Sequence, residues 1–466
     1  MYCDMLQDAV LKIESIKEYY LSQVDHINDS INIDSKKYVL GTVIDYYMYF
    51  KAIDNTELFE GKEGQGIKDF VESIVTDLNI TKTEENKVSF SYKINKREEF
   101  EKDGFELNPQ KASKEYNKII ERPLLFSSSS LMMLLIKYEE AISSLFEYLV
   151  NTYPNAYLNK KTMSYSEMLE IDADSLCIKE YFVKKEVEEI MRLSVSEWYK
   201  LLEQNHKISL SSLISYYDEF KEIYYRRNII VHNNGVVNKT YLKGVDEHNR
   251  NGIIVGDKLS VNKDYMERAF NLTHIMIYGT FFETIKLCKD EGRIISLLFD
   301  LGFQHMLNKE WEVSKFIFNK LGKNKSQKES DIMMDKVNYW ISIKNSSGID
   351  TIKSEVESCD VSAMSDIFKL AKAVLLDQHK RTNQLLEKVF PNEISADSIE
   401  RWPLFIQYRE CDEYSEFKEA HRESFNMYDY ERELNQSTEI FQDKKGNCLS
   451  ELEGKVLNEE VAIMNE

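Results

Sequence analysis

The chain has 466 residues, of which 60 are Lys or Arg and 80 are Asp or Glu, so its formal net charge is -20 at pH 7. Such an acidic chain is not a general nucleic-acid coat or a polybasic membrane binder, because those proteins present a basic surface. The 42% of hydrophobic residues provide a sizeable core, and only five Pro and 16 Gly predict a mainly helical fold.

Cysteine usage and the N-terminal sequence predict a cytoplasmic protein with no membrane partner. The six cysteines show no short pair spacing, which excludes a disulfide framework or a zinc site of the usual kind. The N-terminus lacks the features of a signal peptide. The longest apolar segment, 123–136, is interrupted by serines and is too short to span a bilayer.

Residues 1–112 are predicted to form an N-terminal domain that is helical or α+β. Apolar residues recur at helical spacing in 6–24 and 38–52, which predicts two amphipathic helices. The segment 87–94 alternates apolar with polar residues and predicts a half-buried strand. No catalytic constellation is found in this part of the chain.

Residues 113–291 contain four long helical segments, and their short connections favour a four-helix bundle. Between the third and fourth segments, two short extended stretches around a polar loop predict an inserted β-hairpin. The helices are predicted at 131–153, 178–204, 211–232 and 264–289, and the hairpin between 235 and 261.

Residues 292–430 show loose helical-hairpin repetition close to the tetratricopeptide (TPR) pattern, with unit starts roughly 30 to 40 residues apart. Plain helical hairpins without a superhelix are the alternative. Residues 431–466 form an acidic C-terminal tail, which is usually a solvated end. An inhibitory mimic of nucleic acid is a second interpretation of the tail.

The segment that points to chemistry is the end of the third bundle helix, around Arg227 and His232. Gly235 suits the left-handed residue that follows a helix, so His232 is expected in the last turn, near water. Asn228 precedes His232 by four residues and is expected to share its helix face and to orient the imidazole. Arg226 and Arg227 add planar groups that bind phosphate oxygens in pairs.

These residue types suit RNA cleavage by internal attack of the 2′-hydroxyl. Imidazole side chains titrate near neutral pH and can move protons, while Arg can hold the charge that develops on phosphorus. This reaction needs no metal or cofactor, and the sequence offers no carboxylate cluster to hold a metal. Spacing alone is weak support, because Arg268 and His274 have nearly the same spacing. The apolar neighbours of His274 predict an ordinary core histidine.

The run RRNIIVHNNGVVNKTYL resembles the signature of the HEPN superfamily, small helical bundles found in many prokaryotic toxins and phage-defence ribonucleases. Arg227, Asn228 and His232 match its motif in order and type. The resemblance covers about 170 residues, from near Ser127 to near Lys289. It implies a metal-independent endoribonuclease that works as a homodimer, with the two Arg–His sets in one composite cleft.

On this resemblance Arg227 and His232 are expected to be catalytic and Asn228 to support them. Glu139 or Glu140 of the first bundle helix is a further candidate partner across the bundle. The basic local charge favours RNA as the substrate. The residues expected to bind RNA are Tyr225, Arg226, Asn233, Lys239 and Lys243.

The leading hypothesis is therefore an RNase toxin or abortive-infection antiviral effector, whose repeats bind a protein partner or sense a trigger. The alternative is a non-catalytic scaffold or sensor in which the HEPN and TPR-like parts assemble a partner in a defence or regulatory complex. A nucleotidyltransferase or phosphohydrolase finds little support, because no Gly-rich phosphate loop is present.

Overall fold

The computed structural model describes residues 2–52, 62–82, 88–168, 178–250, 252–288, 291–324 and 327–426. The protein is mainly helical. Residues 1–284 form one compact unit, and the chain from Ile285 onward forms a second. This division lies close to the boundary predicted at 291. Residues on both sides of the boundary predicted at 112 belong to the first unit.

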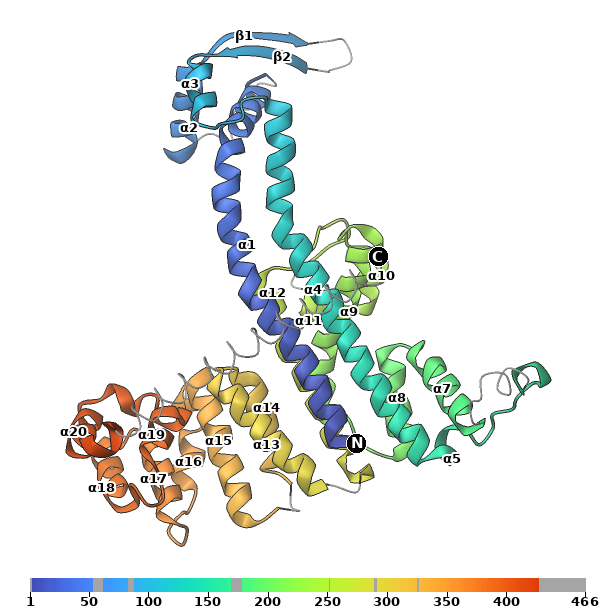
Figure 1. Cartoon of the computed structure of the whole chain (residues 1–466), viewed down its shortest axis with the longest axis vertical. Coiled ribbons are helices and arrows are strands. Elements are labelled where there is room, and N and C mark those ends of the chain that lie inside the picture. The colour runs from blue at the N-terminus through green and yellow to red at the C-terminus, as the bar shows by residue number, and fades with distance from the viewer. Residues whose placement is uncertain are drawn as a thin grey trace, which may run out of the picture. The chain divides into compact units, whose positions relative to one another are not determined.

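Two long antiparallel helices, α1 (Tyr2–Ala52) and α4 (Pro109–Thr152), connect the bundle to a small head formed by the residues between them (Figure 1). α1 is a single helix of 51 residues and not the two that we predicted. Its apolar face packs along α4, and the Tyr20 hydroxyl lies 3.1 Å from the Ser127 hydroxyl. Packing on α4 thus extends α1 through a polar stretch that has no strong helical pattern of its own.

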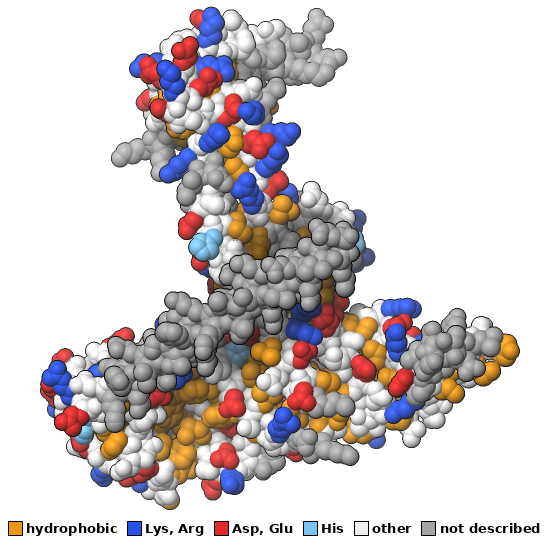
Figure 2. Space-filling model, in the orientation of Figure 1, with side chains coloured by type: hydrophobic (Ala, Val, Ile, Leu, Met, Phe, Trp, Pro, Cys, Tyr) orange, Lys and Arg blue, Asp and Glu red, His pale blue; other side chains and the backbone are white. Residues whose placement is uncertain are grey.

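A small α/β head lies where α1 ends and α4 begins (Figure 1). Its core is made by Ile44, Tyr47, Val71 and Leu107, with apolar side chains of the sheet packed against them. The predicted strand is present as β2, paired antiparallel with β1. Lys or Arg and Asp or Glu side chains are interspersed over the visible face of the head (Figure 2). The head elements are α2 (Lys62–Ile74), β1 (Val75–Lys82), β2 (Val88–Ile94) and α3 (Arg97–Lys102).

The lower parts of α1 and α4 pack with α9 and α12 into a bundle, and α7 and α8 lie against α4. α12 is buried on nearly all sides, as expected of a central helix. The predicted helix 178–204 is broken, because Ser194 and Glu197 form a capping box that starts α8. The bounds are α5 (Pro154–Tyr157), α7 (Ile178–Met191), α8 (Val195–His206), α9 (Ile214–Asn233) and α12 (Lys263–Thr284).

The predicted β-hairpin between α9 and α12 is wrong. The segment forms the short helices α10 (Lys239–Gly244) and α11 (Glu247–Arg250), with one isolated bridge between Val236 and Lys258. The Asn238 side chain caps α10 by accepting from the backbone N–H of Tyr241 at 2.9 Å. Capping and burial of the tyrosine outweigh the strand preference of the Val and Thr residues.

By length and composition, the segment Lys111–Thr152 is long and apolar enough to cross a membrane. Of its most apolar stretch of 18 residues, 33% is buried inside the protein. A core helix of a bundle passes the same test, so this composition does not identify a membrane protein. The exposed share includes Leu125, Met133 and Ile136, which are 65%, 45% and 46% exposed.

The second unit is a series of helical hairpins, in which α13 packs on α14, α14 on α15, and α17 on α18. Gly302 of α13 allows a close crossing, since a Cβ there would lie 3.0 Å from Ile317 and Phe318 of α14. The predicted tail 431–466 lies outside the described residues. The helices are α13 (Glu291–Leu307), α14 (Trp311–Leu321), α15 (Glu329–Ser347), α16 (Lys353–Ser358), α17 (Asp366–Leu375), α18 (His379–Val389), α19 (Ala396–Arg401) and α20 (Asp412–Ala420).

Asp335 on α15 makes the stability of the second unit depend on pH. Its side chain is 1% exposed, and burial raises the pKa of its carboxyl to about 7. Because the folded state holds this proton more tightly than the unfolded state, its stabilising contribution is present at acidic pH. That contribution is lost as the pH rises through 7, with a slope of at most about 1.4 kcal/mol per pH unit.

We therefore expect Asp335→Asn to raise the midpoint of thermal unfolding near pH 8 and to change it little near pH 4. The control is Asp350→Asn, at an exposed position in the short helical turn after α15, which should have no such pH-dependent effect. Thermal unfolding of both variants across this pH range provides the measurement. An equal effect of Asp335→Asn at both pH values would contradict the expectation.

Candidate functional site

The end of α9 is closed by two residues in the left-handed region. Asn234 has φ 49° and Gly235 has φ 76°. The backbone N–H of Gly235 donates to the carbonyl of Ile229 at 2.9 Å, which ties the turn back onto the helix. His232 therefore lies in the last turn, as predicted.

Arg226 is the centre of a buried polar network that joins α9, α10 and α12. Its Nε donates to Oε1 of Glu222 at 2.8 Å, and its Nη1 donates to the carbonyl of Ser260 at 2.8 Å. The hydroxyls of Tyr241 and Tyr265 donate to the two oxygens of Glu222 at 2.6 and 2.7 Å. The guanidinium also stacks 4.1 Å above the Tyr265 ring. The carboxylate is thus satisfied on both oxygens although it is only 5% exposed.

Arg226, which we expect to bind RNA, thus uses its guanidinium for contacts inside the protein. Tyr225 is also held in place, since its ring packs against Gly244 of α10. A Cβ on Gly244 would lie 1.9 Å from Cζ of that ring. Tyr225 still lines the cavity described below, so it remains close to the motif.

Arg227, the neighbour of Arg226, points to the other side of α9 and meets α4. Its Nη2 donates to Oε1 of Glu139 at 3.2 Å, and its guanidinium lies 5.7 Å from the centre of the Tyr224 ring. Burial raises the pKa of the Glu139 carboxyl, although Arg227 acts in the opposite direction. Of the two acidic candidates on α4, Glu139 is the one that reaches Arg227, whereas Glu140 pairs with Lys137.

Arg227 and Glu139 lie in the wall of a cavity of about 400 Å³ between α4, α8 and α9. Burial and the nearby Glu139 carboxylate raise the pKa of Tyr224 well above its ordinary value, so this phenol stays neutral. The cavity thus joins an arginine, a carboxyl group and a phenol with several aromatic rings. The lining residues are Glu139, Met191, Leu193, Ser194, Val195, Ser196, Trp198, Tyr217, Lys221, Tyr224, Tyr225, Arg227 and Asn228.

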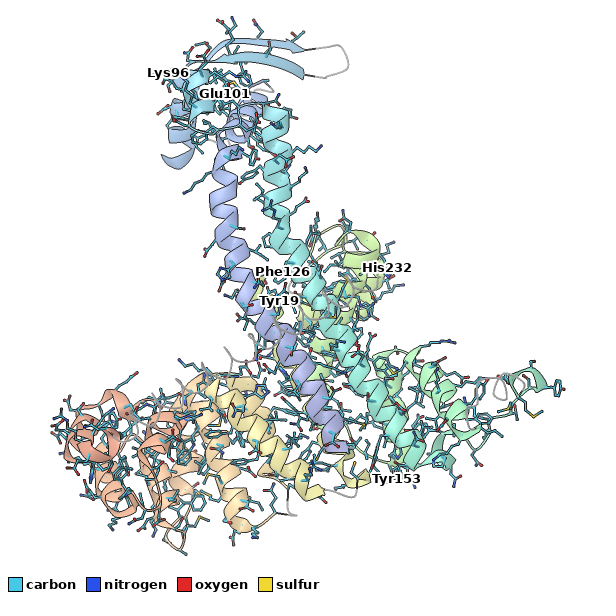
Figure 3. All side chains as sticks on the ribbon, viewed as in Figure 1. Tyr19, Lys96, Glu101, Phe126, Tyr153 and His232 are labelled. Carbon is cyan, nitrogen blue, oxygen red and sulfur yellow. The ribbon has the colours of Figure 1, made fainter. Side chains whose placement is uncertain are left out.

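His232 lies near the end of α9 (Figure 3), and Asn228 lies one turn before it on the same helix. Both side chains are exposed, and Asn228 also lines the cavity. Among the described residues, no hydrogen bond joins Asn228 to His232, and none joins His232 to Arg227. The structure therefore brings Arg227 and Asn228 to the cavity and leaves the imidazole of His232 open to solvent one turn further along.

The remaining residues expected to bind RNA surround the end of α9. Lys239 and Lys243 are exposed on α10, and Asn233 donates from Nδ2 to the carbonyl of Val236 at 2.5 Å. Lys221 is engaged in the same region, where its ammonium lies 3.1 Å from Oδ2 of Asp246. The two lysines of α10 are the cations of this set without an ion pair in the described part of the chain.

The prediction for His274 is confirmed. Its side chain is fully buried within α12, and its Nε2 lies 3.1 Å from Oε1 of Glu14 on α1. It belongs to the bundle core and not to the motif.

The sequence did not predict the cavity itself. Two of its lining residues, Ser194 and Ser196, lie at the start of α8, in a segment predicted to be the interior of one long helix. Their position depends on the break before α8, for which the S-x-x-E pattern from Ser194 to Glu197 was the available sign.

No protein-family model matches the chain, and no curated protein or solved structure shows significant similarity to it.

The buried network predicts a large difference between Arg226 and an exposed cation nearby. Arg226→Ala should lower the free energy of unfolding by about 3–5 kcal/mol, because it leaves Glu222 buried and without its charge partner. Lys243→Ala should change it by less than about 0.5 kcal/mol. Urea unfolding of the two variants tests this. A loss below about 1 kcal/mol for Arg226→Ala would show that this network does not hold the three helices together.

Proposed function

We propose that this protein is a metal-independent endoribonuclease of the HEPN type that acts as a toxin or abortive-infection effector. In this proposal α4, α7, α8, α9 and α12 are the HEPN bundle, extended by α1. Arg227 binds the reacting phosphate, Asn228 supports it, and His232 transfers protons. The second unit is a TPR-like array that binds a protein partner or senses a trigger.

The observation that carries the proposal is the Arg227–Glu139 pair in the wall of a cavity. A surface arginine on a long side chain loses much rotamer freedom when it binds a ligand. Here the carboxylate of Glu139 and the ring of Tyr224 already hold the guanidinium at the cavity. Such preorganisation suits a group that must bind charge as it develops on a phosphate.

The exposure of His232 supports a proton-transfer role in a shared cleft. Its ring has no hydrogen-bond partner among the described residues, so both ring nitrogens can exchange protons with a substrate.

The exposed apolar side chains of α4 support the homodimer. Leu125, Met133 and Ile136 follow one another at spacings of eight and three residues, which places them on one face of the helix. Glu139 lies one turn beyond Ile136. A second copy packed on this face would bring its own motif near the first cavity.

The second candidate function is a non-catalytic scaffold or sensor. It is favoured by the engagement of both arginines with acidic partners, Arg226 with Glu222 and Arg227 with Glu139, as expected of structural residues. The two functions differ in whether His232 is needed, because no contact in the described structure depends on this side chain.

The ribonuclease reading predicts cleavage of RNA by the full chain in excess chelator, leaving 2′,3′-cyclic phosphate ends. His232→Ala and Arg227→Ala should each lower the rate at least about a hundredfold, in line with loss of a proton-transfer or charge-binding group. End-mapping of total RNA provides the measurement. His248→Ala and Arg401→Ala, exposed residues outside the motif, are matched controls and should cleave normally. Cleavage that survives in both motif variants would rule out the assignment.

Glu139 is expected to act as a positioning residue for Arg227. Glu139→Gln keeps the shape of the side chain but removes the charge, so kcat should fall about tenfold while KM changes little. In the wild type, protonation of Glu139 weakens the pair, so the rate should fall on the acidic side of the raised pKa. The acidic fall that is due to this group should be missing from the pH profile of Glu139→Gln. An unchanged pH profile would mean that Glu139 has a structural role alone.

A further inference from the structure

The cavity beside Arg227 has the composition of a site for a flat aromatic ligand. Rings of Tyr217, Tyr224 and Tyr225 from α9 and of Trp198 from α8 contribute to its wall. Proteins that bind unstacked RNA hold the bases on such rings and recognise their edges by hydrogen bonds. The volume of about 400 Å³ lies in the range of small-molecule sites.

The polar groups of the cavity have opposite hydrogen-bonding character. Glu139 provides a carboxylate that accepts, and Lys221 provides an ammonium that donates. Oε1 of Glu139 takes one hydrogen bond from Arg227, which leaves acceptor positions on a group with about four lone pairs. Lys221 donates to Asp246 at 3.1 Å and its ammonium lies 3.5 Å from Oδ1 of Asp218, which leaves one of its three N–H groups for a ligand.

We propose that this cavity is a guanine-binding pocket that selects the nucleobase next to the phosphate held by Arg227. Guanine offers two adjacent donors, N1–H and the N2 amino group, which suit a carboxylate. It also offers two adjacent acceptors, O6 and N7, which suit an ammonium. Adenine lacks the O6 acceptor, and the pyrimidines lack an N7. The pocket would make the proposed ribonuclease selective for one base. This inference therefore rests on the proposed function.

The location of Arg227 in the cavity wall connects the pocket to the chemistry. A base inserted among the tyrosines keeps its own phosphate within a few bonds, so this phosphate is directed to the guanidinium. Extraction of a base from a stack costs a few kcal/mol, and this cost is smallest for single-stranded RNA. We therefore expect single-stranded RNA to be bound at this site.

The test is the binding of the four nucleoside 3′-monophosphates to the full chain, measured by calorimetry. Guanosine 3′-monophosphate should bind at least about tenfold more tightly than the other three, as for a site that matches polar groups to one ligand. Leu193 lines the pocket outside the proposed catalytic set, so Leu193→Trp should fill it and lower this affinity at least tenfold. Leu11→Trp, at an exposed position of α1, is the control and should bind like the wild type.

A second variant guards against a folding defect in Leu193→Trp. Lys221→Met removes the donor to O6 and N7 and leaves Glu139 in place, so it should lower the preference for guanine over adenine while both still bind. Circular dichroism checks that both variants are folded. Equal binding of all four nucleotides by the wild type, or an unchanged preference in both variants, would overturn the pocket.

The binding test separates this inference from the proposed function. Guanine-selective binding by a protein that cleaves no RNA would support the guanine pocket and rule out the ribonuclease function. Cleavage by a wild-type protein that binds the four nucleotides equally would rule out the guanine pocket and support the ribonuclease function.

Discussion

The carboxylate of Glu222, buried within the bundle, is the group on which the geometry of the motif depends. A charge in this position is costly unless it is paired and hydrogen-bonded. Arg226, Tyr241 and Tyr265 meet that requirement, and they come from α9, α10 and α12. Satisfying one carboxylate therefore fixes three helices against one another. The end of α9, and with it the direction of Arg227 and His232, follows from that arrangement.

The two adjacent arginines of α9 face opposite sides of the helix and contact different acidic partners. Arg226 and Arg227 are indistinguishable by composition, and both fit a phosphate-binding role in the sequence. Successive residues on a helix differ by about 100° in direction, so one arginine faces α12 and the other faces α4. Which of them is available to a ligand depends on acidic partners that are 4 and 88 residues away. Only the first of these spacings is visible as a local pattern.

The helical class, the strand β2 and the core position of His274 could be predicted from the sequence, because each depends on local periodicity. The length of α1 could not, since its middle part is held by α4 and not by its own composition. The short helix α10 was missed because burial of Tyr241 on Glu222 outweighs the local strand preference. Of the candidate site, the residues on α9 were predicted. The cavity was not, since it needs the break at Ser194 that brings α8 to face α9.

The bundle takes its first helix from the beginning of the chain and its last from residues near 284. The Tyr2 hydroxyl donates to the carbonyl of Phe281 at 2.9 Å, a contact between residues 279 positions apart. Loops of this length make the pairing slow compared with local helix formation. During synthesis α1 can pair with α4 first, but the part of its surface that meets α12 stays uncovered until α12 has left the ribosome. A ribosome-bound fragment that ends before α12 also lacks Tyr265, and with it one of the three donors that hold the Glu222 carboxylate and fix the end of α9.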